Sequence, residues 1–428
     1  MKTLLRGRVL SFTAEPVNAD DSSAFTYFED GAVLVDGGEI VAMAEFGDMD
    51  ASGAEIVDHR PNLIMPGFID THNHFPQMQV IGSYGAQLLD WLNNYTFPAE
   101  TKFVNSKHAE RMAVKYFDEM LRNGTTTPVA YCSVHKESAE AYFAEAERRN
   151  IRALGGKVLM DRNAPDGLLD TPQTAYDETN ELIGKWHGRG RGLYVISPRF
   201  AITSTPEQLE MTQALVAENR DCYMQTHLSE NHDEIAYTMS LYPQHSDYLG
   251  IYEHYGLLGP KSLFGHCIHL NDRERALMAE TQSVAVFCPT SNLFIGSGLF
   301  NEERTREDGV RIAVATDIGG GTSYSMLRTM DEAYKVCQLQ NQNLPPLYAF
   351  YLMTLGNARA LGLETDIGTL EVGSSADIAV LDARATPSMA LRMETVETLA
   401  EELFVLQTLG DDRSVVETYV AGIAAKPV

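Results

Sequence analysis

The sequence predicts an α/β fold: a (β/α)8 TIM barrel accompanied by a small β-sandwich domain that both chain ends form. In the middle of the chain, eight apolar runs of strand length alternate with amphipathic helical patterns, as in a parallel barrel. Both ends instead carry short strand-like runs around glycine, so we expect them to pair with each other. The predicted boundaries are residues 1–64 and 365–428 for the two parts of the β-sandwich domain, and residues 65–364 for the barrel.

The N-terminal part is expected to contain a hairpin. The runs Gly31–Val35 and Glu39–Ala44 flank Asp36-Gly37-Gly38, which is a favoured turn sequence. Short strand patterns return near the end of the chain at Ile367–Asp382 and Thr418–Ala424. This shared texture is the reason for assigning both ends to one sheet domain.

The barrel elements follow from hydrophobic periodicity. The expected strands are Leu63–Ile69, Thr125–Tyr131, Ile151–Met160, Leu193–Ser197, Asp221–His227, Ser262–His266, Val284–Cys288 and Val310–Thr316. The expected helices between them are Ser106–Arg122, Lys136–Arg149, Thr174–Trp186, Pro206–Glu218 and Asn271–Thr281.

Composition excludes several classes of function. The 428 residues include 33 lysines and arginines against 59 aspartates and glutamates, which gives a formal net charge of −26. Such a surface repels phosphate backbones and anionic lipids, so we expect no nucleic acid and no membrane partner, but a small molecule. No apolar stretch reaches the roughly 18 residues of a membrane span. The 5 cysteines are widely spaced, which favours reduced, mostly buried thiols and a cytoplasmic protein.

Histidines and an acid follow the ends of four expected strands. His72 and His74 end the first run, and in an extended segment their imidazoles point to the same side. His227 ends the fifth run, His266 ends the sixth, and Asp317 follows the eighth. The C-terminal ends of barrel strands meet at one mouth. Three imidazoles and one carboxylate there would suit Zn²⁺ or Fe²⁺ and leave room for a water.

Each of these residues also has a structural interpretation when it is taken alone. His266 could be a core histidine, and Asp317 could cap a helix before Gly319-Gly320-Gly321, where we expect a close backbone approach. Glu230, three residues after His227, could be an acid favoured at a helix start. It is also well placed to carry protons between a metal-bound water and a substrate. A metal would lower the pKa of that water from about 15.7 toward about 7.

Other features carry no functional prediction. His108-Ala109-Glu110 resembles the H-x-E of zinc nucleobase deaminases of the cytidine-deaminase type, but no P-C-x-x-C follows it. The sequence has no HExxH, no P-loop and no GxGxxG after a strand. Trp91 and Tyr95 could line the mouth of the site, but core packing is the favoured interpretation for both.

Together the motifs resemble the amidohydrolase superfamily and, within it, the bacterial type of the guanine deaminase family. The most specific stretches are LLDWLNNYTFPAE and SPRF. The similar segments extend over essentially the whole chain, at Pro66–Glu100, Asn123–Thr127, Gly156–Asp166, Ser197–Ser204, Thr226–Asn231, Phe287–Phe300, Thr316–Leu327 and Thr408–Ser414.

This resemblance implies an enzyme that converts guanine and water to xanthine and ammonia, with a metal-activated hydroxide attacking C2 of the purine. It implies one Zn²⁺ per chain, with Fe²⁺ as an alternative, and a cytoplasmic homodimer. The implied metal ligands are His72, His74, His227 and Asp317. The implied catalytic residues are Glu230, His266 and Asp317. The implied substrate-binding residues are Gln77, Arg199, Phe200, His227 and Glu230.

The chemistry explains why such residues are needed. C2 of guanine is a weak electrophile, so Glu230 would take a proton from water and deliver it to N3, while His266 stabilises the tetrahedral adduct. Asp317 is the favoured donor of the proton that the leaving amine needs. Arg199 can donate two hydrogen bonds to O6 and a ring nitrogen, and the amine of adenine would leave those donors unpaired. Phe200 could stack on the ring.

Two alternatives remain open from the sequence. The first is an aminohydrolase of the same superfamily that acts on another ring, such as 8-oxoguanine, a pyrimidine or a triazine. The second is a non-catalytic scaffold homologue, which missing metal ligands would indicate; in this chain every ligand position is filled.

Overall fold

The computed structural model describes residues 2–85 and 87–427. Met1, Ala86 and Val428, which fall within the predicted domain boundaries and the motif Pro66–Glu100, lie outside the described residues. The chain divides into two compact units. One contains residues 1–70, 118–127 and 324–428, and the other contains residues 71–117 and 128–323. The predicted α/β fold class is confirmed, whereas the domain boundaries placed after residues 64 and 364 remain predictions.

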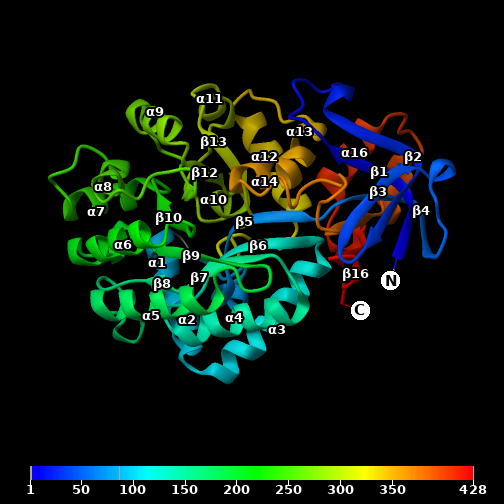
Figure 1. Ribbon diagram of the computed structural model, residues 1–428. Coiled ribbons are helices and arrows are strands. Elements are labelled where there is room, and N and C mark those ends of the chain that lie inside the picture. The colour runs from blue at the N-terminus through cyan, green and yellow to red at the C-terminus, as the bar shows by residue number, and fades with distance from the viewer. Residues whose placement is uncertain (1, 86, 428) are drawn as a thin grey trace. The chain divides into compact units, whose positions relative to one another are not determined.

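Parallel strands form a nearly closed barrel with helices around it (Figure 1). The strand order is β13-β12-β11-β10-β9-β7-β6-β5, with β8 paired to β9. Consecutive strands are neighbours because a connection on the outside returns the chain before each new parallel strand. The strands are β5 (Phe68–His74), β6 (Thr125–Tyr131), β7 (Ala153–Gly156), β8 (Val158–Leu159), β9 (Gly192–Pro198), β10 (Tyr223–Leu228), β11 (Ser262–His266), β12 (Val284–Phe287) and β13 (Arg311–Val314).

Backbone and side-chain contacts bring the last strand back to the first. Thr71 Oγ1 donates to the carbonyl of Val314 at 3.0 Å, and the N–H of Asp317 donates to the carbonyl of His72 at 2.9 Å. Strand β5 is buried along its whole length, as expected for a parallel strand that is covered on both faces.

The connecting helices agree closely with the periodicity of the sequence, and three of them, α3, α4 and α6, have the predicted bounds. The helices from this part of the chain are α1 (Leu88–Trp91), α2 (Phe97–Glu100), α3 (Ser106–Arg122), α4 (Lys136–Arg149), α5 (Pro172–Trp186), α6 (Pro206–Glu218), α7 (His232–Leu241), α8 (Tyr248–His254), α9 (Asp272–Thr281), α10 (Pro289–Phe294) and α11 (Glu302–Glu307).

Two of the predicted barrel strands are wrong, because each predicted run contains parts of two separate strands. The run Leu63–Ile69 is divided at Gly67, because the residues before it complete β4 of the other sheet and only those after it begin β5. A Cβ atom on Gly67 would lie 2.3 Å from Thr126 Oγ1, so the chain passes too closely there for a side chain. The run Ile151–Met160 is interrupted at Lys157, whose buried ammonium group forms ion pairs outside the ladder.

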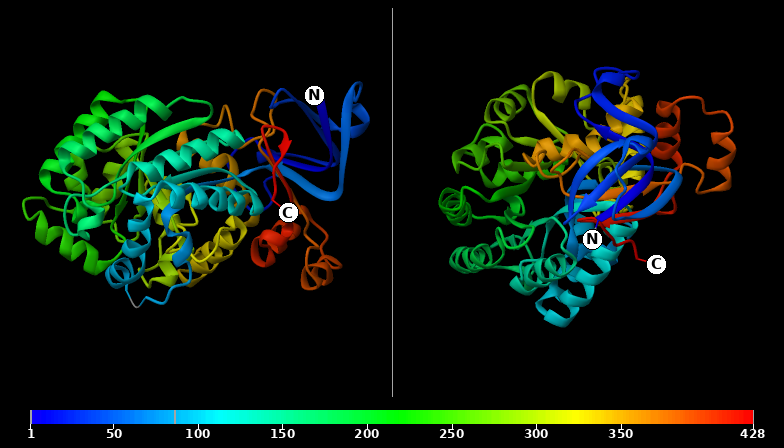
Figure 2. Two further views of the ribbon diagram at one scale, coloured as in Figure 1. Left: turned by 90° about the horizontal axis from the view of Figure 1, so that it is seen from below. Right: turned by 45° about the vertical axis from the view of Figure 1, so that its right-hand side comes forward.

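The two chain ends form one seven-stranded sheet with the order β16-β15-β14-β4-β1-β2-β3. In Figure 2 the blue N-terminal strands and the red C-terminal strands lie side by side in this sheet. The predicted hairpin joins β2 and β3 through Gly37 and Gly38, whose φ values of 64° and 93° suit a tight turn. The strands are β1 (Lys2–Phe12), β2 (Phe25–Asp36), β3 (Glu39–Glu45), β4 (Ala54–Pro66), β14 (Ile378–Leu381), β15 (Val415–Val420) and β16 (Ile423–Ala424).

The C-terminal part contains more helix than the sequence analysis anticipated. Its helices are α12 (Met326–Leu339), α13 (Pro346–Tyr351), α14 (Asn357–Leu361), α15 (Pro387–Met393) and α16 (Leu399–Leu409). Of the expected strand region Ile367–Asp382, only β14 is a strand. No helix in the described part of the chain is long and apolar enough to cross a membrane. All five cysteines are buried and free, as expected.

Candidate active site

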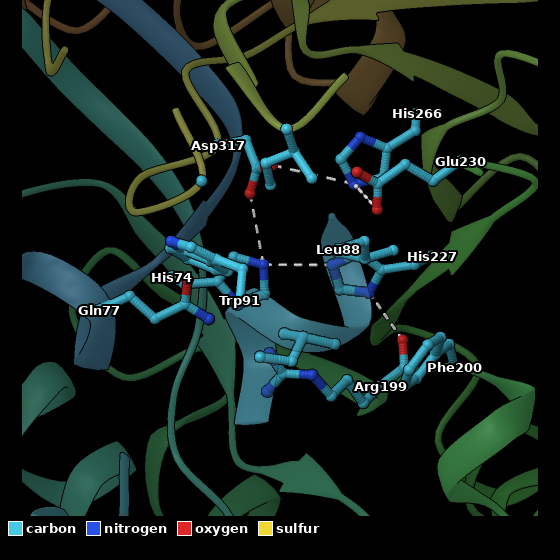
Figure 3. A pocket seen from close by; sticks show the side chains of 13 residues that line it. His74, Gln77, Leu88, Trp91, Arg199, Phe200, His227, Glu230, His266 and Asp317 are labelled. Carbon is cyan, nitrogen blue, oxygen red and sulfur yellow. Dashed lines mark hydrogen bonds and ion pairs between the residues drawn. The ribbon is translucent and has the colours of Figure 1, made fainter. Parts of the chain in front are cut away.

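Five of the predicted site residues lie at the C-terminal ends of barrel strands, and four of them, His74, His227, His266 and Asp317, line one pocket (Figure 3). The fifth, His72, belongs to the same cluster of side chains. The parallel register between β10 and β11 sets Leu228 beside His266 and His227 beside Gly265. His72, His74 and His227 offer ring nitrogens within 4.8 Å of one another, and so do the ligand atoms of His72, His266 and Asp317. All five of these histidine and aspartate side chains are buried.

The distances between these donor atoms suit one metal ion. His74 Nε2 and His227 Nε2 are 3.1 Å apart, and Asp317 Oδ1 is 3.4 Å from both His72 Nε2 and His74 Nε2. A tetrahedral ion with bonds of about 2.0–2.1 Å holds its ligand atoms roughly 3.4 Å apart. Three imidazoles and one carboxylate therefore fit a divalent metal in both chemistry and spacing.

The electrostatics of the cluster favour metal-binding protonation states. Burial lowers the pKa of His72, and it lowers the pKa values of His74 and His227 well below the usual range, so the imidazoles are neutral. Burial alone would raise the pKa of Asp317, but the hydrogen bond from His72 and the electrostatic influence of the neighbouring histidines bring it down to about 2. His227 Nδ1 lies 2.7 Å from the carbonyl oxygen of Arg199, to which it can donate, so Nε2 is free to face the cluster.

Glu230 and His266 lie together on one side of the pocket. Glu230 Oε2 is 3.3 Å from His266 Nε2, while Ser297 Oγ donates to Glu230 Oε1 at 2.8 Å. Burial raises the pKa of Glu230. Burial alone would lower the pKa of His266. The carboxylates of Glu230 and Asp317 have the larger, opposite effect, so the pKa is raised overall. His266 Nδ1 lies 2.9 Å from Asn292 Oδ1, which fixes the ring with Nε2 toward the acids.

The backbone that presents these groups is held in an unusual conformation. Ser229, His266 and Asp317 have φ values of 50°, 71° and 51°, a region that costs energy for residues other than glycine. After Glu230, the first turn of α7 is capped by Glu234, whose Oε2 accepts from the N–H groups of Glu230 at 2.8 Å and Asn231 at 3.1 Å. The surroundings therefore fix the position of Glu230 through its main chain as well as its side chain.

A second group of residues lines the same pocket, which contains about 390 Å³ of empty space. Figure 3 shows Gln77 and Arg199 on the side of the His74–His227 pair away from Glu230. Phe200 and Trp91 also line the pocket. Trp91 packs in a core cluster, as favoured, and it also forms part of the pocket wall, the alternative left open by the sequence. Tyr95 packs against that cluster, as expected.

Two glycines allow the backbone to approach the site. A Cβ atom on Gly265 would lie 2.4 Å from the ring of His72, and a Cβ atom on Gly319 would lie 2.5 Å from the carbonyl oxygen of Gln77. The triple glycine therefore makes the close approach that was predicted for it. His108 lies on α3 against Phe103 and is not among the pocket residues, in agreement with its structural interpretation.

Sequence reasoning missed four polar residues that support the site: Glu100, Glu234, Asn292 and Ser297. Three of them lie inside motifs already singled out, with Glu100 ending TFPAE and the other two in FCPTSNLFIGSGLF. Glu234 is the third residue of α7 after its cap Asn231, a capping-box position that the sequence could have revealed. The partner of each residue could not be read from the sequence.

Comparison with known proteins identifies the family. The model of the amidohydrolase family matches residues 63–424. The chain belongs to the guanine deaminase branch of that family. It is 46% identical over 422 residues to guanine deaminase of Escherichia coli strain K12, covering 98% of this chain and 96% of that protein. The resemblance inferred from the motifs is thus confirmed.

Solved structures of the family have the same fold. The structure of the E. coli guanine deaminase matches with a TM-score of 0.96 at 45% identity and covers 99% of both chains. The guanine deaminase of C. acetobutylicum, with guanine bound in its active site, matches with a TM-score of 0.89 at 30% identity, over 99% of this chain and 100% of that chain.

Proposed function

We propose that this protein is a metal-dependent enzyme that hydrolyses guanine to xanthine and ammonia. The observation that carries this proposal is one buried pocket that unites a metal-type cluster, a buried acid beside a histidine, and an arginine–glutamine edge. The family relationship supports it, because the similar proteins are guanine deaminases and one of them holds guanine in its active site.

The metal we propose is one Zn²⁺ per chain, held by His72, His74, His227 and Asp317. Support comes from the neutral imidazoles and from donor spacings close to those of a tetrahedral site. Fe²⁺ accepts the same nitrogen and oxygen set and is the alternative. When bound, such an ion supplies a nucleophilic water at neutral pH.

Glu230 is the proposed proton carrier of the first step. It accepts a proton from the attacking water and delivers it to N3 of guanine, which makes C2 electrophilic as the new C–O bond forms. Ser297 occupies Oε1 of Glu230, so Oε2 is the oxygen that faces His266 and the reacting atoms. The raised pKa of this carboxyl group favours both halves of the transfer, because the protonated form becomes accessible.

His266 and Asp317 complete the reaction. The imidazole of His266 donates a hydrogen bond from Nε2 to the oxygen of the tetrahedral adduct, in a water-excluded site where such bonds are strong. Asp317 takes the remaining proton of that oxygen and passes it to the amino group, which leaves C2 as ammonia while the C2 carbonyl of xanthine forms. His266 Nε2 is 3.8 Å from Asp317 Oδ2, so the two groups face the same reacting oxygen.

Arg199, Gln77 and Phe200 hold the purine in this proposal. Arg199 donates in a fixed fork to O6 and a ring nitrogen, Gln77 donates from its amide, and the aromatic face of Phe200 contacts the ring. His227 and Glu230 complete the substrate contacts near C2. We further propose a cytoplasmic homodimer, on the basis of the family resemblance and the reduced, buried cysteines.

Ammonia release provides the test. The purified, metal-replete chain is offered guanine, 8-oxoguanine, adenine, cytosine and isocytosine, with metal content measured in parallel. We expect rapid release from guanine, and loss of that release after chelation. Release from another ring in preference to guanine would replace the substrate while leaving the metal site intact. A metal-bound chain that releases ammonia from none of these rings would argue for the scaffold alternative.

A further inference from the structure

A buried carboxylate stands behind the two residues that we propose to hold the purine. Glu100 is the last residue of α2, and only 1% of its surface is exposed. Its Oε1 accepts a hydrogen bond from Gln77 Nε2 at 2.9 Å and another from Arg199 Nη1 at 2.9 Å. Its Oε2 accepts from the same Arg199 nitrogen at 3.0 Å. Glu100 thus joins the two side chains of the pocket edge.

We propose that Glu100 is a positioning residue that fixes a row of hydrogen-bond donors along this edge and thereby selects 6-oxopurines over 6-aminopurines. The inference rests on the proposed function, because it concerns how guanine is recognised. Glu100 itself is not among the pocket-lining residues and acts through Gln77 and Arg199.

The orientation of the Gln77 amide is the first step of the argument. A carboxylate paired with a guanidinium offers only acceptors, so the NH₂ end of Gln77 must face Glu100. The Oε1 end then lies 3.3 Å from the N–H of Gly319 and accepts from it. Both ends of the amide are therefore fixed, and the second Nε2 hydrogen is the one left for a ligand. Without the carboxylate the amide could rotate and present an acceptor instead.

The arrangement of Arg199 is the second step. One terminal nitrogen, Nη1, serves both oxygens of Glu100, so in the described part of the chain Nη2 and Nε remain for a ligand. The guanidinium carbon also lies 5.4 Å from the centre of the Phe97 ring, and Phe97 is in the same short helix as Glu100. Helix α2 therefore holds the guanidinium both electrostatically and by contact.

The position of α2 itself is secured. Ser133 Oγ donates to the carbonyl oxygen of Glu100 at 3.1 Å, which anchors the end of the helix to the segment that follows β6. Arg199 also connects this edge to the metal cluster, because its own carbonyl oxygen is the partner of His227 Nδ1. Displacement of Arg199 would therefore disturb substrate binding first and ligand orientation second.

The resulting edge suits one class of purine. Guanine presents two neighbouring acceptors, O6 and N7, to a row of N–H groups. A purine with an amine at position 6 presents a donor there, so buried donors would face each other without acceptors and binding would be disfavoured. The carboxylate also balances the charge of Arg199, so the edge is suited to a neutral base rather than an anion.

The test compares guanine with 2,6-diaminopurine, which keeps the amine at C2 but carries an amine in place of O6 and therefore an acceptor in place of the N1–H donor. Ammonia release gives kcat and KM for both rings in the wild type, Glu100→Gln and Glu100→Asp. In Glu100→Gln, the amide oxygen can take the place of Oε1, but the NH₂ group then takes the place of Oε2 and faces the donor Nη1 of Arg199. This contact between two donors and the lost negative charge displace Arg199 from the pocket edge. We expect KM for guanine to rise about 10- to 100-fold, and the ratio of kcat/KM between the two rings to fall at least about tenfold. The metal content should stay the same.

Glu178→Gln is the matched control. Glu178 is also a carboxylate that pairs with a buried cation of the same unit, Lys157, whose Nζ is 2.8 Å away. Its own side chain is 35% exposed, and it is not a pocket residue. We expect Glu178→Gln to leave the ratio unchanged. Glu100→Asp keeps the charge but is too short to keep both contacts, so its ratio should fall less than in Glu100→Gln. If Glu100→Gln does not fold, the ratio of kcat/KM in Glu100→Asp tests the role of Glu100.

The outcomes separate the two levels of the proposal. A wild-type chain that releases no ammonia from guanine would overturn the proposed function, whatever the variants do. An active wild type whose preference for guanine persists in the Glu100 variants would overturn only the role of Glu100. An equal loss of preference in Glu178→Gln would assign the effect to the fold and also overturn that role.

Discussion

The surroundings of the Glu230 carboxyl group suit the proton transfer that we propose for it. It is buried, one of its oxygens accepts from Ser297, and the other faces His266 at 3.3 Å. Burial raises its pKa, so protonation near neutral pH requires less free energy than for an exposed glutamate. Such a group can both accept and release a proton during one turnover.

We therefore predict that Glu230→Gln lowers kcat for guanine by about two to four orders of magnitude, since the amide cannot carry the proton. The variant should keep its metal and its melting temperature, because glutamine has nearly the same shape and is outside the proposed ligand set. Stopped-time ammonia assays with parallel metal analysis would measure both. A rate within about threefold of the wild type would exclude Glu230 as the proton carrier.

At the scale of residues, the sequence predicted the groups that end strands and not those that support them. His72, His227 and Asp317 could be identified because barrel strands bring their C-terminal ends together. Glu100 meets Arg199 across 99 positions of sequence, and no local pattern records such a contact. The same reason explains why Asn292 was missed.

At the scale of elements, the start of α7 fixes the backbone of the segment that contains Glu230. The side chain of Glu234 accepts from the N–H of Glu230 and from that of the cap Asn231, so helix initiation and placement of the acid use the same carboxylate. Helix α9 begins with an equivalent capping box formed by Asn271 and Glu274. The two helix starts therefore form a natural matched pair.

We predict that Glu234→Ala lowers kcat about 10- to 100-fold, because loss of the two hydrogen bonds to the backbone lets Glu230 move out of its working position. Both Glu234→Ala and Glu274→Ala should lower the free energy of unfolding by about 1–2 kcal/mol, but Glu274→Ala should leave kcat unchanged. Steady-state kinetics together with denaturant unfolding would compare the two variants. Equal kcat values in both would show that the cap of α7 serves stability alone.

The loop after β8 contains Asp170, which forms an ion pair with Lys157, the residue between β7 and β8. Lys157 Nζ lies 2.8 Å from Asp170 and 2.8 Å from Glu178, and its side chain is fully buried. Burial raises the pKa of Asp170 from its ordinary value of 3.8 to about 6, even though Lys157 opposes the shift. Between these two values the folded state binds more protons at Asp170 than the unfolded state does.

Because the pKa of Asp170 is raised in the folded state, stability should depend on pH. The contribution of Asp170 to stability grows as pH falls from about 6 to about 4 and is lost as pH rises through 6, with a slope of at most about 1.4 kcal/mol per pH unit. The difference in melting temperature between the wild type and Asp170→Asn should therefore shift in favour of the wild type as pH falls from 7 to 5. Thermal unfolding at several pH values would measure it, and a difference that does not change with pH would contradict it.

Most elements were predictable because buried helices and strands leave strong periodic patterns. Helices α3, α4 and α6 have the predicted bounds. Pattern alone failed at Gly67, where one apolar run continues through two sheets, since both neighbours of the glycine are buried and only close packing shows the boundary. Helix α16 was not anticipated because the short strand patterns on both sides of it led to assignment of the whole C-terminal part to the sheet domain.

For the whole molecule, the net charge of −26 contrasts with the composition of the pocket. Within the pocket, Arg199 is balanced by Glu100, and the imidazoles of His74 and His227 are neutral. The edge that we propose to hold the purine therefore carries balanced charge, while the acidic net charge of the chain discourages polyanions. This agrees with a small neutral substrate.

The proposed metal connects strands that are far apart in the sequence, so its removal should affect both activity and stability. Its four ligands follow β5, β10 and β13 or lie within them, and an ion that binds only the folded state stabilises it by about 4 kcal/mol at a free concentration 1,000 times its Kd. We predict that chelation abolishes ammonia release and lowers the melting temperature by several degrees, and that Zn²⁺ restores both.

Glu230→Gln separates the two effects of the metal. This variant should show the same loss of melting temperature on chelation and the same recovery with Zn²⁺, although it has almost no activity in either state. Calorimetry of both proteins with and without chelator, followed by addition of Zn²⁺ or anaerobic Fe²⁺, would measure the response to each ion. If chelation changed neither activity nor melting temperature, the four ligands would not hold a metal that the reaction needs. If Fe²⁺ restored activity and Zn²⁺ did not, the site would remain but its proposed ion would be wrong.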